Sequence, residues 1–241
     1  MTTQRTGANA AQIKVLCSNS SRAVMDELVP QFERASGHKV AVSYDPAKIM
    51  LQRIQRGETA DLAILGAPAI DELTKQGKIV SASRRDLARC GIGVAVRAGA
   101  PKPDIGSVEA FKRALLNAKS VAHTKSGVSG MHFAGLIERL GIAEQMKARV
   151  RTQPGGLVGE LVASGDVEMA VQQIPELMAV PGTELVGPLP RELQMITVSS
   201  AGIFADAREP AAAQALLEFL STPAAARVYK ARGLEPVVTV G

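Results

Sequence analysis

The sequence predicts an α/β protein made of two lobes that are joined by two crossing strands. Short apolar runs alternate with amphipathic helix patterns along most of the 241 residues. This alternation is typical of parallel βαβ units with helices on both faces of a sheet. The number of strand-like runs, together with the two long segments 90–97 and 193–204, favours two sheets over one. The expected division is a flexible lead at 1–11, lobe one at 12–89 and 204–241, and lobe two at 90–203.

The composition excludes several classes of protein. Hydrophobic residues make up 46% and charged residues 21%, which is ordinary for a globular chain. Trp is absent and aromatic residues reach only 3%, so stacking platforms for nucleic acid or sugars are not expected. The net charge is +5, but the basic residues are scattered. We therefore expect a small anionic ligand rather than nucleic acid. Cys17 and Cys90 lack metal-site spacing, so no metal and no cofactor is expected.

The first strand, 14–17, runs through Ser18, Asn19, Ser20 and Ser21 into a helical pattern. This junction leaves several free backbone N–H groups and hydroxyls at one point. The start of the helix adds roughly half a positive charge there, which suits an anion. Capping of the helix by Ser20 or Ser21 is the structural alternative.

The remaining elements follow from apolar periodicity and from Pro and Gly at their ends. For example, Asp45 and Pro46 open a helix that Gly57 ends. Further strands are expected at 38–44, 60–65, 90–97, 120–123, 149–153, 167–173, 184–187 and 193–204. Further helices are expected at 46–56, 69–76, 108–118, 131–140, 143–147, 157–163, 210–220 and 224–231.

The turns that follow the predicted strands share one chemistry. Ligands of open α/β sheets bind outside the carboxyl ends of the strands. Here the residues at those ends are mostly small, hydroxylic or glycine, and most of them open a helix. The turns are 18–21, 45–48, 66–67, 124–130, 154–156 and 172–173. Two lobes that face each other across such ends form a cleft of converging N–H donors, which suits an oxyanion or a carboxylate.

Three stretches carry a resemblance to a known family. The runs at 13–37, 53–64 and 213–225 resemble solute-binding proteins of the molybdate-binding type, and the likeness extends over about 12–236. The runs at 172–176 and 186–194 are similar to a large branch of substrate-binding proteins. The resemblance implies the type II periplasmic-binding-protein fold with a ligand cleft between the lobes. It also implies an ABC transporter in a membrane as the partner if the protein is exported.

Only some residues of that family's oxyanion-binding site have a counterpart in this sequence. Its first serine matches Ser20, whereas its second serine falls on Ala47. Its backbone contacts fall on Ser129 and Gly155, and the tyrosine that closes the molybdate site falls on Gln173. The loss of one serine and of the tyrosine disfavours a tetrahedral oxyanion.

Basic residues near the expected seat favour a longer ligand with carboxylates. Lys48 follows the second turn, and Lys125 and His132 belong to the third turn and its helix. Solvated lysines and a surface or packing histidine are the alternatives, although a cation at a helix N-terminus is mildly unfavourable without a local anion. The expected ligand-binding residues are Ser18, Asn19, Ser20, Ala47, Lys48, Thr124, Ser126, Ser129, Gly130, Gly155, Gly156, Gln172 and Gln173.

Two functions remain open. The first is binding of a di- or tricarboxylate by a monomeric protein whose lobes close on the ligand. The second comes from aconitate isomerase, which resembles the same branch and implies a cofactor-independent isomerase that shifts a proton on an unsaturated polycarboxylate. Such an enzyme needs one positioned acid–base group, for which Lys48, Lys125 and His132 are the candidates.

The start of the sequence bears on location. It lacks the apolar core of a secretory signal, and no apolar run approaches the ~20 residues of a membrane span. As printed, the chain is expected to be cytoplasmic, or periplasmic if a leader was removed.

Overall fold

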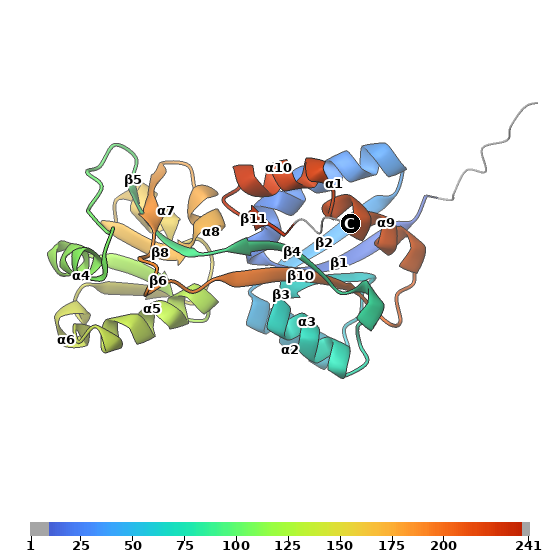
Figure 1. The fold of residues 1–241 in the computed structure, drawn as a ribbon, viewed down its shortest axis with the longest axis horizontal. Helices are drawn as coiled ribbons and strands as arrows, with labels where there is room; N and C mark the ends of the chain where they lie inside the picture. The colour runs from blue at the N-terminus through green and yellow to red at the C-terminus, as the bar shows by residue number, and fades with distance from the viewer. Residues whose placement is uncertain (1–9, 238–241) are drawn as a thin grey trace, which may run out of the picture.

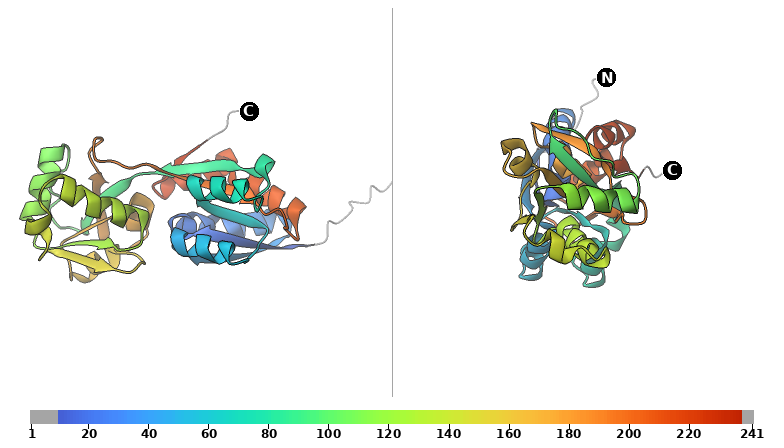
Figure 2. Two further views of the ribbon diagram at one scale, coloured as in Figure 1. Left: turned by 90° about the horizontal axis from the view of Figure 1, so that it is seen from below. Right: turned by 90° about the vertical axis from the view of Figure 1, so that its left-hand side faces the viewer.

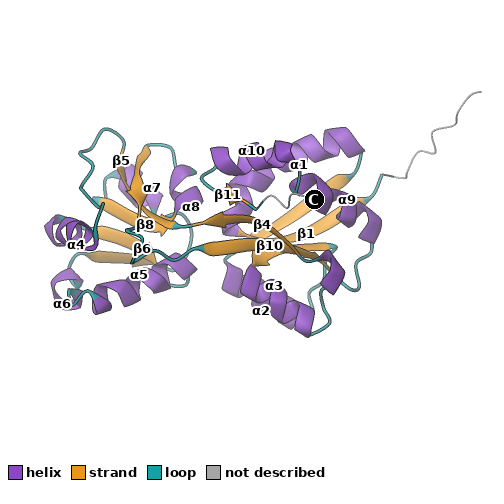
Figure 3. Ribbon diagram, viewed as in Figure 1, coloured by secondary structure: helices purple, strands orange, loops and turns teal. Residues whose placement is uncertain are grey.

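The computed structural model describes residues 10–237 and contains two α/β lobes that lie side by side (Figure 1). Each lobe has one sheet with helices on both faces (Figure 3). The chain crosses between the lobes twice, and the view from below in Figure 2 shows these crossings clearly. The predicted fold class is therefore confirmed. Of the predicted flexible lead 1–11, residues 1–9 lie outside the described residues.

The strands and helices have the following bounds. The strands are β1 (Gln12–Ser18), β2 (Lys39–Asp45), β3 (Leu62–Gly66), β4 (Arg85–Cys90), β5 (Ile92–Arg97), β6 (Val121–Thr124), β7 (Val150–Gln153), β8 (Met169–Gln173), β9 (Thr183–Pro188), β10 (Thr197–Ile203) and β11 (Glu235–Pro236). The α-helices are α1 (Arg22–Ser36), α2 (Ala47–Gln55), α3 (Ala67–Lys75), α4 (Val108–Asn117), α5 (Val128–Arg139), α6 (Ala143–Met146), α7 (Gly159–Ser164), α8 (Ile174–Met178), α9 (Pro210–Leu220) and α10 (Pro223–Ala231). Two short 3-10 helices are η1 (Asn19–Ser21) and η2 (Ser81–Ser83).

Both sheets combine parallel strands with antiparallel ones. Lobe one has the order β11-β4-β10-β3-β1-β2, and lobe two has the order β7-β6-β8-β5-β9. The triplets β2-β1-β3 and β7-β6-β8 are parallel, as expected of βαβ units. Strands β4, β5 and β10, which lie next to the crossings, pair antiparallel to their neighbours. The carboxyl ends of the parallel triplets are therefore where a cleft between the lobes can form.

In lobe one, hydrophobic clusters cover both faces of the six-stranded sheet. One cluster joins the sheet to α1, α9 and α10, with Met25, Leu28 and Phe32 of α1 at most 3% exposed. The other joins it to α2 and α3 through Met50 and Ile70. Burial of such side chains contributes roughly 1.5–3 kcal/mol each. This packing holds the start of α1 and the start of α2 at the same edge of the sheet.

Lobe two is built in the same way. Phe111 of α4 and Phe133 of α5 are fully buried against one face of the five-stranded sheet. Val162 of α7 and Leu177 of α8 cover the other face. The start of α5 is thereby fixed beside the end of β6.

Four elements longer than three residues differ from the sequence prediction by more than two residues, and one is the strand predicted at 193–204, which begins only at Thr197 as β10. The charged stretch before Cys90 forms β4, which the prediction omitted because Arg85, Asp86 and Arg89 mask its alternation. Helix α5 starts at Val128, three residues before the predicted start, because Gly127 and Gly130 let it approach β6 closely. Residues 174–178, which had no assignment, form α8.

The pairing of β10 bears on the division into lobes. The prediction gave 90–203 to lobe two. However, β10 pairs with β3 and β4 in the six-stranded sheet. We therefore propose that residues 197–203 belong to lobe one, together with the predicted 12–89 and 204–241.

A glutamine side chain fixes the crossing between β4 and β5. Oε1 of Gln194 accepts from the Ile92 N–H at 2.7 Å, and its Nε2 donates to the Ile92 carbonyl at 2.9 Å. A Cβ at Gly91 would lie 2.8 Å from Nε2 of Gln194, so the contact requires glycine there. Among residues 10–237, no helix is long and apolar enough to cross a membrane.

Candidate functional site

A cleft between the lobes lies at the carboxyl ends of β1, β2, β6, β7 and β8. The turns after these strands supply most of its lining. Its lining residues in lobe one are Ser18, Asn19, Ser20, Pro46, Ala47 and Lys48. Those in lobe two are Thr124, Ser126, Gly127, Val128, Ser129, Met131, Gly155, Gly156, Gln172, Gln173 and Glu176. The lobes come close here, since a Cβ at Gly155 would lie 3.6 Å from Cγ of Pro46.

The first wall of the cleft is the turn from β1 into α1. The hydroxyls of Ser18 and Ser20 lie 3.2 Å apart. Ser21 points away from the cleft, because its hydroxyl lies 3.0 Å from that of Ser199 on β10. Neither Ser18 at the start of η1 nor Ser21 at the start of α1 makes a side-chain capping bond. Capping by these side chains therefore does not satisfy the N–H groups at this helix start.

The second wall is the start of α2. Pro46 precedes Ala47, and no side chain caps the helix. Asp45, the predicted cap, is instead bound by Arg53 of the same helix. Lys48 is exposed in the first turn, and no carboxylate among residues 10–237 lies within ion-pair distance of it. The cleft thus has an uncompensated cation at a helix N-terminus.

The third wall is the start of α5. Thr124 is only 3% exposed, and its Oγ1 has no hydrogen-bond partner within the described part of the chain. Ser129 is 2% exposed in the first helical turn. A Cβ at Gly130 would lie 1.8 Å from the Thr124 carbonyl oxygen, so this glycine packs the helix against β6. Gly130, although predicted to bind the ligand, does not line the cleft.

The remaining wall of the cleft is held in place by the side-chain amides of Gln172 and Gln173. Nε2 of Gln172 donates to the Gly156 carbonyl at 2.8 Å, and its Oε1 accepts from the Val158 N–H at 3.0 Å. Nε2 of Gln173 donates to the Thr197 hydroxyl at 3.1 Å. Gln172 thereby holds the turn after β7, and Gln173 ties the cleft to the crossing strand β10.

The structure does not bring two of the three acid–base candidates to the cleft. Lys125 is exposed outside the lining, and its backbone N–H donates to the Gln153 carbonyl at 2.8 Å. Nε2 of His132 donates to the Leu193 carbonyl at 2.8 Å on the flank of α5. His132 is therefore a packing residue and Lys125 a solvated lysine, which were the alternatives to a role in the site. Of the three candidates, only Lys48 lines the cleft.

Glu176 is a lining residue that the sequence reasoning missed. It lies in the first turn of α8, directly after β8. Burial raises the pKa of its carboxyl to about 7, while hydrogen bonds from the Gln173 backbone and the Gln172 side chain act in the opposite direction. Pro175 in the first helical turn was the available sequence signal, since Pro68 opens α3 in the same way directly after β3.

A second hollow adjoins the cleft beside Glu176. The cleft itself holds about 100 Å³, and the hollow holds about 630 Å³. The two share Asn19, Ser20, Gly156 and Glu176. Small-molecule sites usually measure roughly 300–1,000 Å³. The cleft and the hollow together therefore offer room for a ligand longer than a tetrahedral oxyanion.

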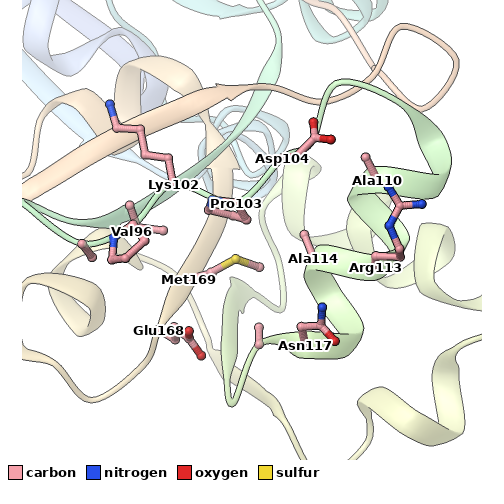
Figure 4. Close-up of a pocket in the computed structure, with 13 residues that line it drawn as sticks. Val96, Lys102, Pro103, Asp104, Ala110, Arg113, Ala114, Asn117, Glu168 and Met169 are labelled. Carbon is pink, nitrogen blue, oxygen red and sulfur yellow. The ribbon is translucent and has the colours of Figure 1, made fainter.

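A separate pocket of about 400 Å³ lies elsewhere in lobe two, beside α4 (Figure 4). Lys102, Asp104, Arg113 and Glu168 are its charged lining residues, and Lys102 is paired with Glu184 at 3.3 Å. It contains none of the predicted site residues. In residues 10–237, no three or more His, Cys, Asp or Glu side chains are grouped so that they could hold a metal ion.

Comparisons with known proteins agree with this architecture. The family model described as bacterial extracellular solute-binding protein matches residues 13–235. Aconitate isomerase from a Pseudomonas species is 35% identical over 231 residues, covering 93% of this chain and 88% of that protein. A molybdate-binding protein from Azotobacter vinelandii is 29% identical over 238 residues, covering 94% and 90%. The solved structure of the periplasmic molybdate-binding protein from the same organism has a TM-score of 0.75 at 20% identity, covering 92% of this chain and 98% of that one.

These findings decide two of the expectations from the sequence. The predicted cytoplasmic location is not supported, because the matching family is described as extracellular and the structural relative as periplasmic. The predicted resemblance to molybdate-binding-type solute-binding proteins is confirmed. The chain belongs to the bacterial extracellular solute-binding protein family and has the type II periplasmic-binding-protein fold.

Proposed function

We propose that the protein binds a small organic anion, a di- or tricarboxylate, in the cleft between its lobes. The observation that carries this proposal is the convergence of the starts of α1, α2 and α5 on one cleft beside Lys48, which has no carboxylate partner among residues 10–237. Each helix start supplies N–H donors and a partial positive charge. The buried Thr124 hydroxyl, which lacks a partner among the described residues, adds a donor that a bound oxygen could satisfy.

Two features favour carboxylates over molybdate. Ala47 and Gln173 stand where the molybdate-binding relatives are expected to have a serine and a tyrosine, and the Gln173 amide is already bound to Thr197. Lys48 supplies a full charge that suits a carboxylate. The hollow beyond Glu176 leaves room for the rest of a longer ligand.

A second candidate function is isomerisation of an unsaturated polycarboxylate. The 35% identity to aconitate isomerase over 93% of this chain favours it. An isomerase of this kind needs a group in the cleft that can take up and return a proton. Glu176 is such a group, because its pKa lies near neutrality.

The setting of either function follows from the family. We expect a periplasmic monomer, and for the binding function a membrane transporter as its partner. The same cleft would serve both functions, since an isomerase must also hold its substrate by the carboxylates. Binding is thus the common step, and it is tested first.

A thermal-shift panel tests the proposal. We expect a di- or tricarboxylate to raise the melting temperature more than molybdate or sulfate, and a ligand at 100 times its Kd adds ~2.7 kcal/mol of stability. Lys48→Gln should weaken the best ligand about 3- to 10-fold, because one charged hydrogen bond is lost at an exposed site. The matched control is Lys125→Gln, which lies outside the cleft. The largest shift from molybdate, or equal effects of the two variants, would contradict the proposal.

A further inference from the structure

Glu176 stands in the place where an anion-binding cleft should least tolerate a carboxyl group. It lines both the cleft and the adjoining hollow, so a ligand that occupies both contacts it. A carboxylate at this position repels an anionic ligand. Its presence therefore requires a role that a neutral glutamine, such as the adjacent Gln172 and Gln173, could not fill.

The described surroundings of Glu176 do not neutralise its carboxyl with a cation. Among residues 10–237, no Lys or Arg lies within ion-pair distance of Glu176. The side chain of the neighbouring Gln172 is bound to the Gly156 carbonyl and the Val158 N–H. Burial raises the pKa of Glu176 to about 7, so both protonation states are populated near neutral pH. A carboxyl of this kind that lines a ligand cleft is suited to take up a proton and return it.

The other charged groups around Glu176 are mostly paired with each other. In the hollow, Nη2 of Arg232 lies 2.7 Å from Oε2 of Glu27, and Nε of Arg22 lies 4.0 Å from Oδ2 of Asp26. In the cleft, Lys48 carries a positive charge. The nearby Cys90 thiol has a pKa that burial raises to about 11, so it stays protonated near neutrality. Glu176 is thus the group in this set that changes charge near pH 7.

We propose that Glu176 is the catalytic residue that shifts a proton along an unsaturated polycarboxylate held in the cleft. This rests on the proposed function, because the ligand must be bound by its carboxylates. The ionised carboxyl of Glu176 takes a proton from the methylene group next to the double bond, forming O–H while C–H breaks. The electron pair delocalises through the double bond towards a ligand carboxylate. Glu176 then donates a proton to the far vinylic carbon, either the one it took up or one exchanged with water, and the double bond moves by one position.

Groups across the cleft are placed to stabilise the negative charge that develops. The start of α5 with Ser129, the start of α1 with Ser20, and Lys48 on α2 all face the same space. Such preorganised donors are worth most where charge grows on the way to the transition state. No oxidant, reductant or cofactor enters this step, because the electron pair stays within the ligand and each proton that Glu176 takes up is balanced by one that it donates.

The experiment combines a binding readout with a proton-transfer readout. The probes are cis- and trans-aconitate in deuterated buffer, followed by proton NMR for exchange and interconversion, with calorimetry for Kd. Glu176→Gln should lower the rate at least 100-fold, because general acid–base groups contribute about 10²–10⁴-fold, while the Kd stays within about threefold or tightens. Glu160→Gln, an exposed glutamate in the first turn of α7, is the matched control and should match the wild type.

Wild-type kinetics give a test that needs no variant. The value of kcat/KM should rise with pH and level off above an apparent pKa of about 7, because the free enzyme needs ionised Glu176. Glu176→Asp, which keeps a carboxyl but retracts it, should retain this profile with a lower rate. A flat profile would contradict the assignment even if Glu176→Gln failed to fold.

The outcomes separate the two proposals. Wild-type protein that binds aconitate without exchange or interconversion would overturn the role of Glu176 and leave the binding function standing. Glu176→Gln with a rate within threefold of the wild type would also overturn this role. Failure of every polycarboxylate to bind would overturn the proposed function, and the role of Glu176 with it.

Discussion

At the scale of single residues, Glu176 links the cleft to the stability of the fold. Its carboxyl has an ordinary pKa of 4.5, which burial raises to about 7 in the folded protein. The folded state therefore holds this proton more tightly than the unfolded chain does. The resulting stabilisation is complete below about pH 4.5 and is lost as the pH rises towards 7.

Glu176→Gln should remove this pH dependence. At pH 8 the wild type bears the cost of a poorly solvated, half-buried carboxylate, so the variant should be more stable by about 1–3 kcal/mol. At pH 5 the difference should shrink by most of that amount, because Glu176 is then protonated in the folded state. Urea unfolding at the two pH values measures both differences. Glu160→Gln should show no such change, and an equal effect of Glu176→Gln at pH 5 and pH 8 would contradict the raised pKa.

The sequence placed some site residues better than others. Residues in strand-end turns, such as Ser20 and Gly155, line the cleft because the position of a turn follows from the strand order. Lys125 and His132 do not, because the direction of a side chain depends on where α5 begins, and it begins at Val128. The raised pKa of Glu176 depends on packing from several elements, which a sequence pattern does not report.

At the scale of elements, one carboxylate joins three parts of lobe one. Asp61, just before β3, is 3% exposed. Its Oδ2 accepts from the Lys14 N–H of β1 at 2.7 Å, and its Oδ1 accepts from the N–H groups of Arg208 and Glu209 at 2.8 and 2.9 Å. Asp61 therefore fixes the two residues that lead into α9 from a distant part of the chain.

Asp61→Asn should therefore destabilise lobe one. The amide keeps an acceptor for part of the set but turns an NH2 group towards a backbone donor, and we expect a loss of about 2–4 kcal/mol in the free energy of unfolding. Chemical denaturation measures this loss. Asp206→Asn is the matched control, because Asp206 is exposed and lines the same surface pocket of lobe one as Asp61. A loss below about 0.5 kcal/mol would mean that water replaces the carboxylate without cost.

Elements with clear apolar periodicity were predictable, and those with charges or few residues were not. Helix α9 has the bounds that its pattern predicted, since Pro210 opens a helix with a continuous buried face. Strand β4 was missed because its charged residues hide the apolar alternation of a strand. Tertiary contacts between β10 and β11 accommodate these charges. For example, Asp86 accepts from the Ser200 hydroxyl at 2.5 Å and pairs with Arg84 at 3.0 Å. Propensity is only a weak guide where such contacts decide the structure.

At the scale of the whole molecule, the crossing segments connect the cleft to the arrangement of the lobes. Gln173 lines the cleft and donates to Thr197 on β10, whose hydroxyl also lies 3.1 Å from Sγ of Cys90 on β4. Gln194 spans the neighbouring crossing through Ile92. A ligand that contacts Gln173 is thus one hydrogen bond away from β10 and two away from β4. Sequence reasoning placed two crossings but could not assign these bonds, because they join residues far apart in the chain.

Gln194→Ala tests whether this crossing sets the binding affinity. The Ile92 N–H, in a fully buried residue, loses its bond to Oε1, and the two crossing segments lose the side-chain contact that joins them. If fewer free molecules hold the binding-competent orientation, the apparent Kd rises in proportion. We expect the carboxylate found in the ligand panel to bind about 3- to 10-fold more weakly by calorimetry, although Gln194 does not line the cleft. Gln214→Ala on α9, which removes a bond only to exposed Glu218, should leave the Kd unchanged. A stability loss in Gln194→Ala with unchanged affinity would show that Gln194 supports lobe two without governing how the lobes meet.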